Sequence, residues 1–173
     1  MKSNANAVFD FAKETTLAVG SIDIGDTANA TVGSLAITNG TITVSGAVHV
    51  PTDKLKASYN GLTLSGTTMT VSGVFAVNPN TDGTQGNYAA LYDGCTVTAS
   101  SVDVARKSTL TVAEGSSFTN NGELRVGNLG DGTVTIRDNA TFTQNGSPVN
   151  IAYKGVGNLS VLRGSSFLAG SRR

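Results

Sequence analysis

The stretch SLAITNGTITVSGAVHV, from Ser34 to Val50, aligns without a gap with GLTLSGTTMTVSGVFAV, from Gly61 to Val77, at a shift of about 27 residues. TVTASSVDVA, which begins at Thr96, continues the series about 28 residues later, with a one-residue slip in its last part. A fixed period of about 20–50 residues is typical of repeat architectures. The alignment therefore predicts a chain of stacked, similar coils.

The C-terminal half repeats with a slightly shorter period. STLTVAEGSSFTNNGELRVG, GTVTIRDNATFTQNGSPVNIA and GNLSVLRGSSFLAG carry like residues at spacings of about 24 and 25. The resulting columns are Leu110, Val134 and Leu159; Phe118, Phe142 and Phe167; and Val126 and Ile151. In a β-solenoid each inward position lies on its counterpart in the next coil, about 4.8 Å away, whereas a β-sandwich does not keep residue types in register. The columns favour a solenoid.

Each coil divides into three short strands, which we call a, b and c in chain order. Within each strand, apolar residues alternate with Thr, Ser or Ala, the period expected when one face is buried. In the first coil we place strands a, b and c at Leu17 and Val19, Ile22 and Ile24, and Ala30 and Val32.

The predicted fold class is all-β: a single-stranded, right-handed parallel β-helix, or β-solenoid, of about seven three-strand coils. We expect residues 1–16 to form an N-terminal lead-in or cap. Residues 17–173 are expected to form the solenoid, open at its C-terminus because the last coil has no strand c.

Composition narrows the classes of function. Charged residues make up 14% of the chain, and 12 basic residues balance 12 acidic ones. Proteins that bind nucleic acid carry a basic patch, so nucleic acid is not an expected partner. No stretch approaches the roughly 18 apolar residues of a membrane span, and we expect no membrane insertion by this segment. The first residues also lack the apolar run of a secretory signal, so the chain either stays inside the cell or belongs to a longer exported protein.

Two polar loops interrupt the period, and loops projecting from a rigid stack commonly carry contacts. They are PTDKLKASYN, residues 51–60, and NPNTDGTQGNYA, residues 78–89. The candidate ligand contacts in them are Asp53, Lys54, Tyr59, Asn78, Asn80, Asp82 and Tyr88.

Threonine pairs of the form TxT supply a second candidate surface. The members of the candidate flat face are Thr41, Thr43, Thr68, Thr70, Thr96 and Thr98, which we assign to strand b. A second group, Thr109, Thr111, Thr133 and Thr135, is assigned to strand a, so the two groups do not form one face. Such rows resemble the ice-binding face of β-solenoid antifreeze proteins, although Thr is also simply a favoured outward residue of strands.

The sequence offers little material for catalysis. Its aspartates are scattered over different strands and corners, and only Asp103, Arg106 and Lys107 lie close together along the chain. The single histidine, His49, is expected to point outward from strand c with no motif near it. Cys95 is the single cysteine, which excludes an internal disulfide and a CxxC metal site. We therefore expect no catalytic residues, no metal site and no cofactor.

LRVGNLGDGTVTIRDNATFTQNG resembles the repeats of bacterial autotransporter passengers and related large surface β-helix proteins, in which a VGN..G.GTLTI phrase recurs. The FxxN phrases at Phe75, Phe118 and Phe142 match some passenger families. The resemblance covers residues 102–170 well and 33–77 loosely. It implies a secreted, surface-displayed stalk or adhesin segment, hence an extracellular or cell-surface location, and supplies no catalytic residues to carry over.

Four functions remain open. The first is a structural or adhesive, non-enzymatic segment of a bacterial surface protein that binds host glycan or protein through its loops. The second is ice binding through the threonine rows. A glycan-active β-helix enzyme is the third. The fourth is a self-assembling filament subunit, because an open coil exposes strand edges that favour end-to-end self-association.

Overall fold

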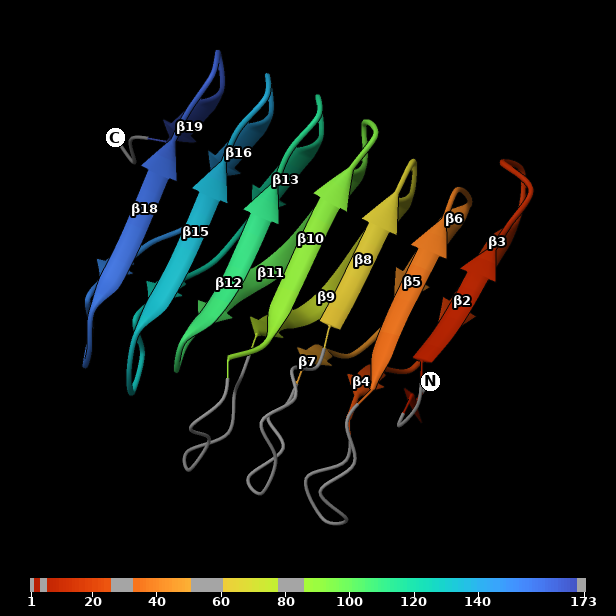
Figure 1. Cartoon of the computed structure of the whole chain (residues 1–173), viewed down its shortest axis with the longest axis horizontal. Helices are drawn as coiled ribbons and strands as arrows, with labels where there is room; N and C mark the ends of the chain where they lie inside the picture. The colour runs from red at the N-terminus through yellow and green to blue at the C-terminus, as the bar shows by residue number, and fades with distance from the viewer. Residues whose placement is uncertain (1, 4–5, 26–32, 51–60, 78–85, 171–173) are drawn as a thin grey trace.

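The computed structural model describes residues 2–3, 6–25, 33–50, 61–77 and 86–170, and every regular element in these ranges is a β-strand. The strands stack into a β-solenoid in which all strand pairs are parallel (Figure 1). No helix in the described ranges has the length and apolar character needed to cross a membrane. The all-β solenoid prediction is confirmed.

Strand a of each coil belongs to a seven-stranded sheet that forms the front of Figure 1. Its members, in spatial order, are β2 (Asn6–Asp10), β5 (Ser34–Thr38), β8 (Gly61–Ser65), β10 (Tyr88–Tyr92), β12 (Ser108–Val112), β15 (Gly132–Ile136) and β18 (Gly157–Val161). Each strand pairs with the counterpart one coil away, so these seven rungs define about six turns of the solenoid.

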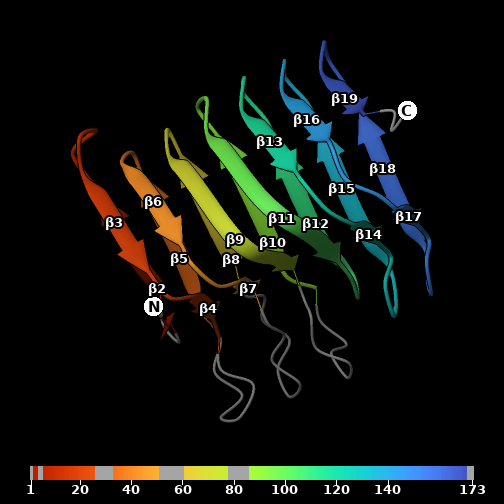
Figure 2. The ribbon, with the colours of Figure 1, turned by 180° about the vertical axis from the view of Figure 1, so that it is seen from behind.

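Strands b and c form the opposite face of the solenoid, which is turned toward the viewer in Figure 2. Strand b comprises β3 (Thr16–Val19), β6 (Thr41–Val44), β13 (Ser117–Asn120), β16 (Thr141–Gln144) and β19 (Ser166–Ala169). Strand c comprises β1 (Lys2–Ser3), β4 (Ile22–Ile24), β7 (Val48–Val50), β14 (Leu124–Val126) and β17 (Val149–Ile151). In the two central coils β9 (Thr68–Val77) and β11 (Thr96–Val104) run through both positions, which joins b and c into one twelve-stranded sheet.

The alternating sequence pattern becomes an alternating burial pattern. In β6 the Ile42 and Val44 side chains are fully buried, while Thr41 and Thr43 are exposed. The inward side chains of successive coils form one continuous apolar cluster, which extends from Ile22 to Phe142. Because each coil is too thin to bury these side chains alone, its stability depends on the coils on either side.

The clearest ladder is the phenylalanine column predicted from the repeats. Phe118 pairs with Phe142 and Phe142 with Phe167 in strand b. The ring centroids of the first pair lie 5.1 Å apart and those of the second 5.5 Å apart, with the rings stacked in both. Phe75 contacts Phe118 edge-to-face from strand c, so the FxxN phrase at Phe75 does not share the column of the other two.

The predicted one-residue slip is a β-bulge. The pairing of β9 with β11 runs in register to Ala99, then resumes at Ser101 opposite Val74. Two residues of β9, Ser72 and Gly73, therefore lie opposite the single Ser100 of β11. Such a bulge bends the strand where the chain turns from position b to position c.

The strand assignment in the first coil was wrong by one position. Leu17 pairs with Ile42 in strand b, and Ile22 pairs with Val48 in strand c. Strand a of this coil is β2, within the segment expected to be a lead-in. In β2 the outward residue Val8 is apolar and 72% exposed. The strand therefore lacks the alternation of inward apolar and outward polar residues seen in its counterparts. Ala30 and Val32, predicted as strand c, lie outside the described residues.

Corner glycines serve two different purposes. At the corner between strands a and b, Asn39 and Gly40 both have positive φ, as the NG pair predicts. At the corner between strands b and c, a glycine is needed at position 46 because the backbone of the preceding coil passes too close for a side chain. A Cβ on Gly46 would lie 2.7 Å from the Gly20 carbonyl oxygen of the coil below.

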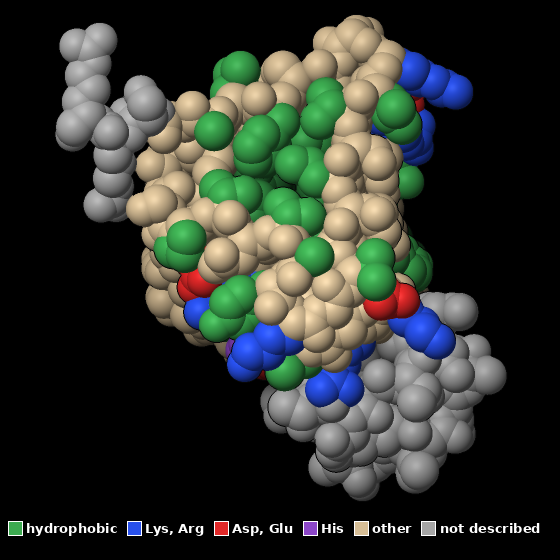
Figure 3. Space-filling model, turned by 90° about the vertical axis from the view of Figure 1, so that its left-hand side faces the viewer, with side chains coloured by type: hydrophobic (Ala, Val, Ile, Leu, Met, Phe, Trp, Pro, Cys, Tyr) green, Lys and Arg blue, Asp and Glu red, His purple; other side chains and the backbone are tan. Residues whose placement is uncertain are grey.

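Figure 3 looks along the stack at the last coil and shows hydrophobic side chains gathered on that face. Large apolar residues exposed in this part of the chain include Val149, Ile151, Val161 and Leu168. Phe142 is fully buried, whereas Phe167, one rung further, is only partly buried.

Truncating the middle of the phenylalanine ladder should be costly. We expect Phe142→Ala to lower the free energy of unfolding by about 3–5 kcal/mol, because the cavity is enclosed by rings on both sides. Phe167→Ala should cost clearly less, since that ring is partly exposed. Chemical denaturation of the two variants measures the difference, and equal losses would contradict the ladder as the source of stability.

Candidate functional site

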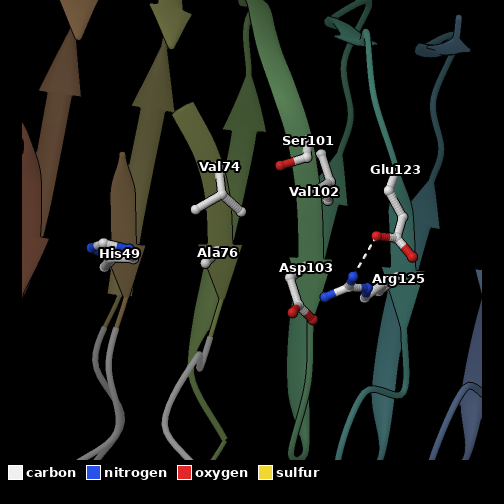
Figure 4. A pocket seen from close by; sticks show the side chains of 8 residues that line it. All are labelled: His49, Val74, Ala76, Ser101, Val102, Asp103, Glu123 and Arg125. Atoms are coloured by element: carbon white, nitrogen blue, oxygen red, sulfur yellow. Dashed lines mark ion pairs between the residues drawn. The ribbon is translucent and has the colours of Figure 1, made fainter. Parts of the chain in front are cut away.

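A concave region on the strand c side of the solenoid brings charged and apolar side chains together. We call it the groove; its volume is about 320 Å³. Its lining residues come from β7, β9 and β11 and from β14 and the residue before it (Figure 4): His49, Val74, Ala76, Ser101, Val102, Asp103, Glu123 and Arg125.

Strand register explains why the groove exists. The outward positions at the middle of strand c form one column of paired residues: Asp23, His49, Ala76, Asp103, Arg125 and Asn150. Ala76 lies in this column between the larger polar residues His49 and Asp103. Its side chain is small and 2% exposed, so it forms the floor of the groove. Val74 pairs with Ser101 beside it and makes the floor partly apolar.

One wall of the groove is a histidine held by a carboxylate. His49 Nδ1 lies 3.0 Å from Asp23 Oδ1, and Ser21 donates to the other oxygen of Asp23 at 2.8 Å. When Nδ1 carries the hydrogen of this bond, the neutral ring keeps Nε2 as an acceptor. The wall thus supplies a polar ring in a fixed orientation, 36% exposed at its side chain.

The opposite wall is Asp103, whose two carboxylate oxygens differ. Oδ2 accepts a hydrogen bond of 2.8 Å from the Asn128 amide. Oδ1 is shielded from water and has no hydrogen-bond donor among the described residues. Burial raises the pKa of Asp103, against the opposing effects of the Asn128 hydrogen bond and the charge of Arg125. Burial therefore disfavours the ionised form of the Asp103 carboxylate in the folded chain.

Arg125 stands next to Asp103 on the following rung, and Figure 4 shows its guanidinium turned toward that residue. Its Nη2 lies 2.5 Å from Glu123 Oε2, and this hydrogen bond lowers the pKa of Glu123. Asn150 donates to the other Glu123 oxygen at 2.8 Å. Arg125 Nε is buried without an acceptor among the described residues. The guanidinium carbon of Arg125 lies over the Tyr153 ring, 5.8 Å from the ring centroid.

Chemically, the groove offers hydrogen-bonding groups of both kinds around a partly apolar floor. Among the described residues, no three or more His, Cys, Asp and Glu side chains are grouped so as to hold a metal ion. The arrangement suits recognition of a small polar ligand.

The six threonines of the predicted flat face are in register on three successive rungs of strand b. Thr41 pairs with Thr68 and Thr43 with Thr70, and the next rung adds Thr96 and Thr98. Two further rungs that were not predicted extend the row: Ser117 and Thr119 on the first, and Thr141 and Thr143 on the second. We call this five-rung surface the threonine face.

The missed residues were visible in the sequence. They flank the phenylalanines of the ladder in the sequences SFT (117–119) and TFT (141–143), so alternation with the buried phenylalanines places them outward. The second threonine group lies in the strand a sheet, as predicted: Thr109 pairs with Thr133 and Thr111 with Thr135.

Six of the seven predicted loop contacts lie outside the described residues: Asp53, Lys54, Tyr59, Asn78, Asn80 and Asp82. Tyr88, assigned to a loop, is instead a strand residue of β10 that is 40% exposed and pairs with Gly61 and Thr109. Its ring lies over Gly61, where no side chain competes for the space.

The groove was not predicted, although His49 points outward as expected. Sequence proximity grouped Asp103 with Arg106 and Lys107, whereas strand pairing sets it beside Arg125, one coil later. The available signal was the column of outward residues at one-coil spacing. No protein-family model, curated protein or solved structure matches the chain.

The raised pKa of Asp103 has a measurable consequence for stability. The folded chain binds this proton more tightly than the unfolded chain, whose reference pKa is 3.8. The group therefore imposes no cost well below pH 3.8, where both states are protonated; the cost grows as pH rises from 3.8 to the folded pKa and is fully present above it. We expect Asp103→Asn to raise the melting temperature at pH 7 by about 1–3 °C.

Thermal unfolding of the unchanged chain and of Asp103→Asn, each at pH 7 and at pH 3.5, tests this. The gain at pH 7 should shrink at the lower pH. A variant that melts at or below the temperature of the unchanged chain at pH 7 would show that the ionised carboxylate stabilises the fold.

Proposed function

We propose that this chain is a non-catalytic structural and adhesive segment of a secreted bacterial surface protein, in which it serves as a rigid stalk. The observation that carries the proposal is the continuous apolar cluster, which extends through the coils from Ile22 to Phe142. Successive coils share both sheets and one core, so the stack bends less readily than domains joined by linkers. The resemblance of residues 102–170 to passenger repeats supports the surface location.

Adhesion requires contacts on the outside of the stack. In this proposal the segments 51–60 and 78–85 contact host glycan or protein, because in the sequence they interrupt the repeat without contributing to its period. Outward strand positions are free to vary as long as inward residues keep the ladders intact, so binding residues can be added without loss of the stalk.

A stalk of equivalent coils should tolerate removal of one whole coil. Ser117 pairs with Thr141, so deletion of residues 117–140 places Thr141 where Ser117 was and preserves every ladder. We expect this variant to remain folded and to melt within about 10 °C of the unchanged chain, because each coil contacts only its neighbours. Deletion of residues 117–128, half that length, should abolish cooperative unfolding.

The measurement is made on the chain fused to an export signal and an outer-membrane anchor, with surface protease resistance and thermal unfolding as readouts. The full chain and the one-coil deletion should both reach the surface as protease-resistant cores. Failure of the full chain to be displayed in folded form would overturn the stalk proposal.

The threonine face favours a second candidate function, binding to ice. Its residues recur on five successive rungs at the strand spacing of about 4.8 Å, and at about 6.6 Å along each strand. Such a two-dimensional array of hydroxyl and methyl groups is suited to an equally regular solid surface.

Thermal hysteresis of the purified chain tests the ice-binding function. If the face binds ice, Thr70→Tyr should remove most of the hysteresis, because the ring would project from the centre of the array. Thr111→Tyr, the same change on the strand a sheet, should leave it intact. Absence of hysteresis in the unchanged chain, or its survival in Thr70→Tyr, would exclude this function.

A further inference from the structure

We propose that the groove is a binding site for a short stretch of neutral, hydroxyl-rich saccharide. The inference deepens the adhesive part of the proposed function and rests on it for exposure of the chain to glycans. It adds a recognition site on strand c to the loop contacts of that proposal.

The floor of the groove fits one face of a sugar ring. Val74 and Ala76 present aliphatic carbon between two polar walls. A pyranose has C–H groups on its faces and hydroxyl groups around its edge, so apolar contact below and hydrogen bonds at the sides can form together. The volume of about 320 Å³ lies at the lower end for small-ligand pockets, which span about 300–1,000 Å³. This space suits one or two sugar rings.

The walls contain a complementary pair of unsatisfied groups. Asp103 Oδ1 is an acceptor without a donor, and Arg125 Nε, on the next rung, is a donor without an acceptor, among the described residues. A hydroxyl group both donates and accepts, so sugar hydroxyls can satisfy the two. The Arg125 side chain is 40% exposed and therefore has room to shift as a ligand enters.

The charged side chains of the groove disfavour anionic ligands and divalent cations. Among the described residues that line the groove, Asp103 and Glu123 outnumber Arg125, the only Lys or Arg in that lining, so an anionic ligand such as a uronate would meet net repulsion. A divalent cation is disfavoured for the opposite reason, because Arg125 lies between Asp103 and Glu123 and is already paired with the latter. An uncharged ligand meets neither penalty.

In this proposal Asp103, whose Oδ1 is buried without a donor among the described residues, is a binding residue rather than a structural one. Its ionised form is destabilised by burial in the folded chain, and polar groups that cost stability are typical of functional sites. A binding role and a structural role therefore predict opposite effects for Asp103→Asn. Binding should weaken while stability rises, whereas a structural residue would lose both.

The experiment is a titration of the ¹⁵N-labelled chain, followed by backbone amide chemical shifts at pH 7. The probes are cellotetraose, mannotetraose and tetra-N-acetylchitotetraose, with tetragalacturonate as the anionic comparison. We expect at least one neutral probe to shift the amides of Ala76, Ser101 and Asp103 with millimolar affinity, and tetragalacturonate to bind at least fivefold more weakly.

Two groove variants and one matched control complete the test. Asp103→Asn should weaken binding at least tenfold, and Ala76→Leu, which fills the floor, should do the same. Asp93→Asn makes the same chemical change at the corner between strands a and b, outside the groove, and should bind as the unchanged chain does. Melting temperatures establish that each variant is folded.

Three results would overturn the inference: no groove shifts with any neutral probe, undiminished binding by Asp103→Asn, or equal binding of tetragalacturonate. None of them bears on the stalk proposal, because surface display of the folded chain is measured separately without ligand. Conversely, if the chain binds saccharide in the groove but is not displayed in folded form, the saccharide inference stands and the stalk proposal fails.

Discussion

Parallel pairing of each strand with its own counterpart one coil away is the constraint on which the rest of the structure depends. At a spacing of about 4.8 Å, an inward side chain touches the equivalent side chain above and below. Like residues therefore stack, as in the column of Phe118, Phe142 and Phe167. A change of register in one coil would misplace every inward residue of that coil, so the ladders hold one another in place.

The same pairing arranges the outside of the molecule into columns. Repetition of threonine at two outward positions, with Ser117 as the one exception, makes a regular surface over five rungs. Substitution within one column does the reverse: Ala76 between His49 and Asp103 leaves a depression with polar walls. Uniform columns and interrupted columns thus give two kinds of surface on one core, an extended array and a local site.

Much of the architecture could be predicted from the sequence because the ladders repeat residue types. The phenylalanine column and the slip near Ala99 follow directly from alignment of the chain with itself. The first coil could not be assigned in this way, because strands a, b and c all alternate with period two and alternation alone does not distinguish them. The groove escaped prediction for another reason: its residues share no motif, and they meet only when outward positions are aligned one coil apart.

The groove also shows how a repeat fold can accommodate a carboxylate whose ionised form is disfavoured by burial. Asp103 is outward, so the cost of burying its charge falls on the wall of the groove, while the neighbouring inward Val102 and Val104 keep their ladders. Stability in a solenoid is a sum of contacts between adjacent coils. A local cost at one rung is therefore offset by the rungs beside it, without any change in register. An outward column of such a fold can therefore carry a buried polar atom without a partner among the described residues, as Asp103 Oδ1 is, while the inward ladders stay in register.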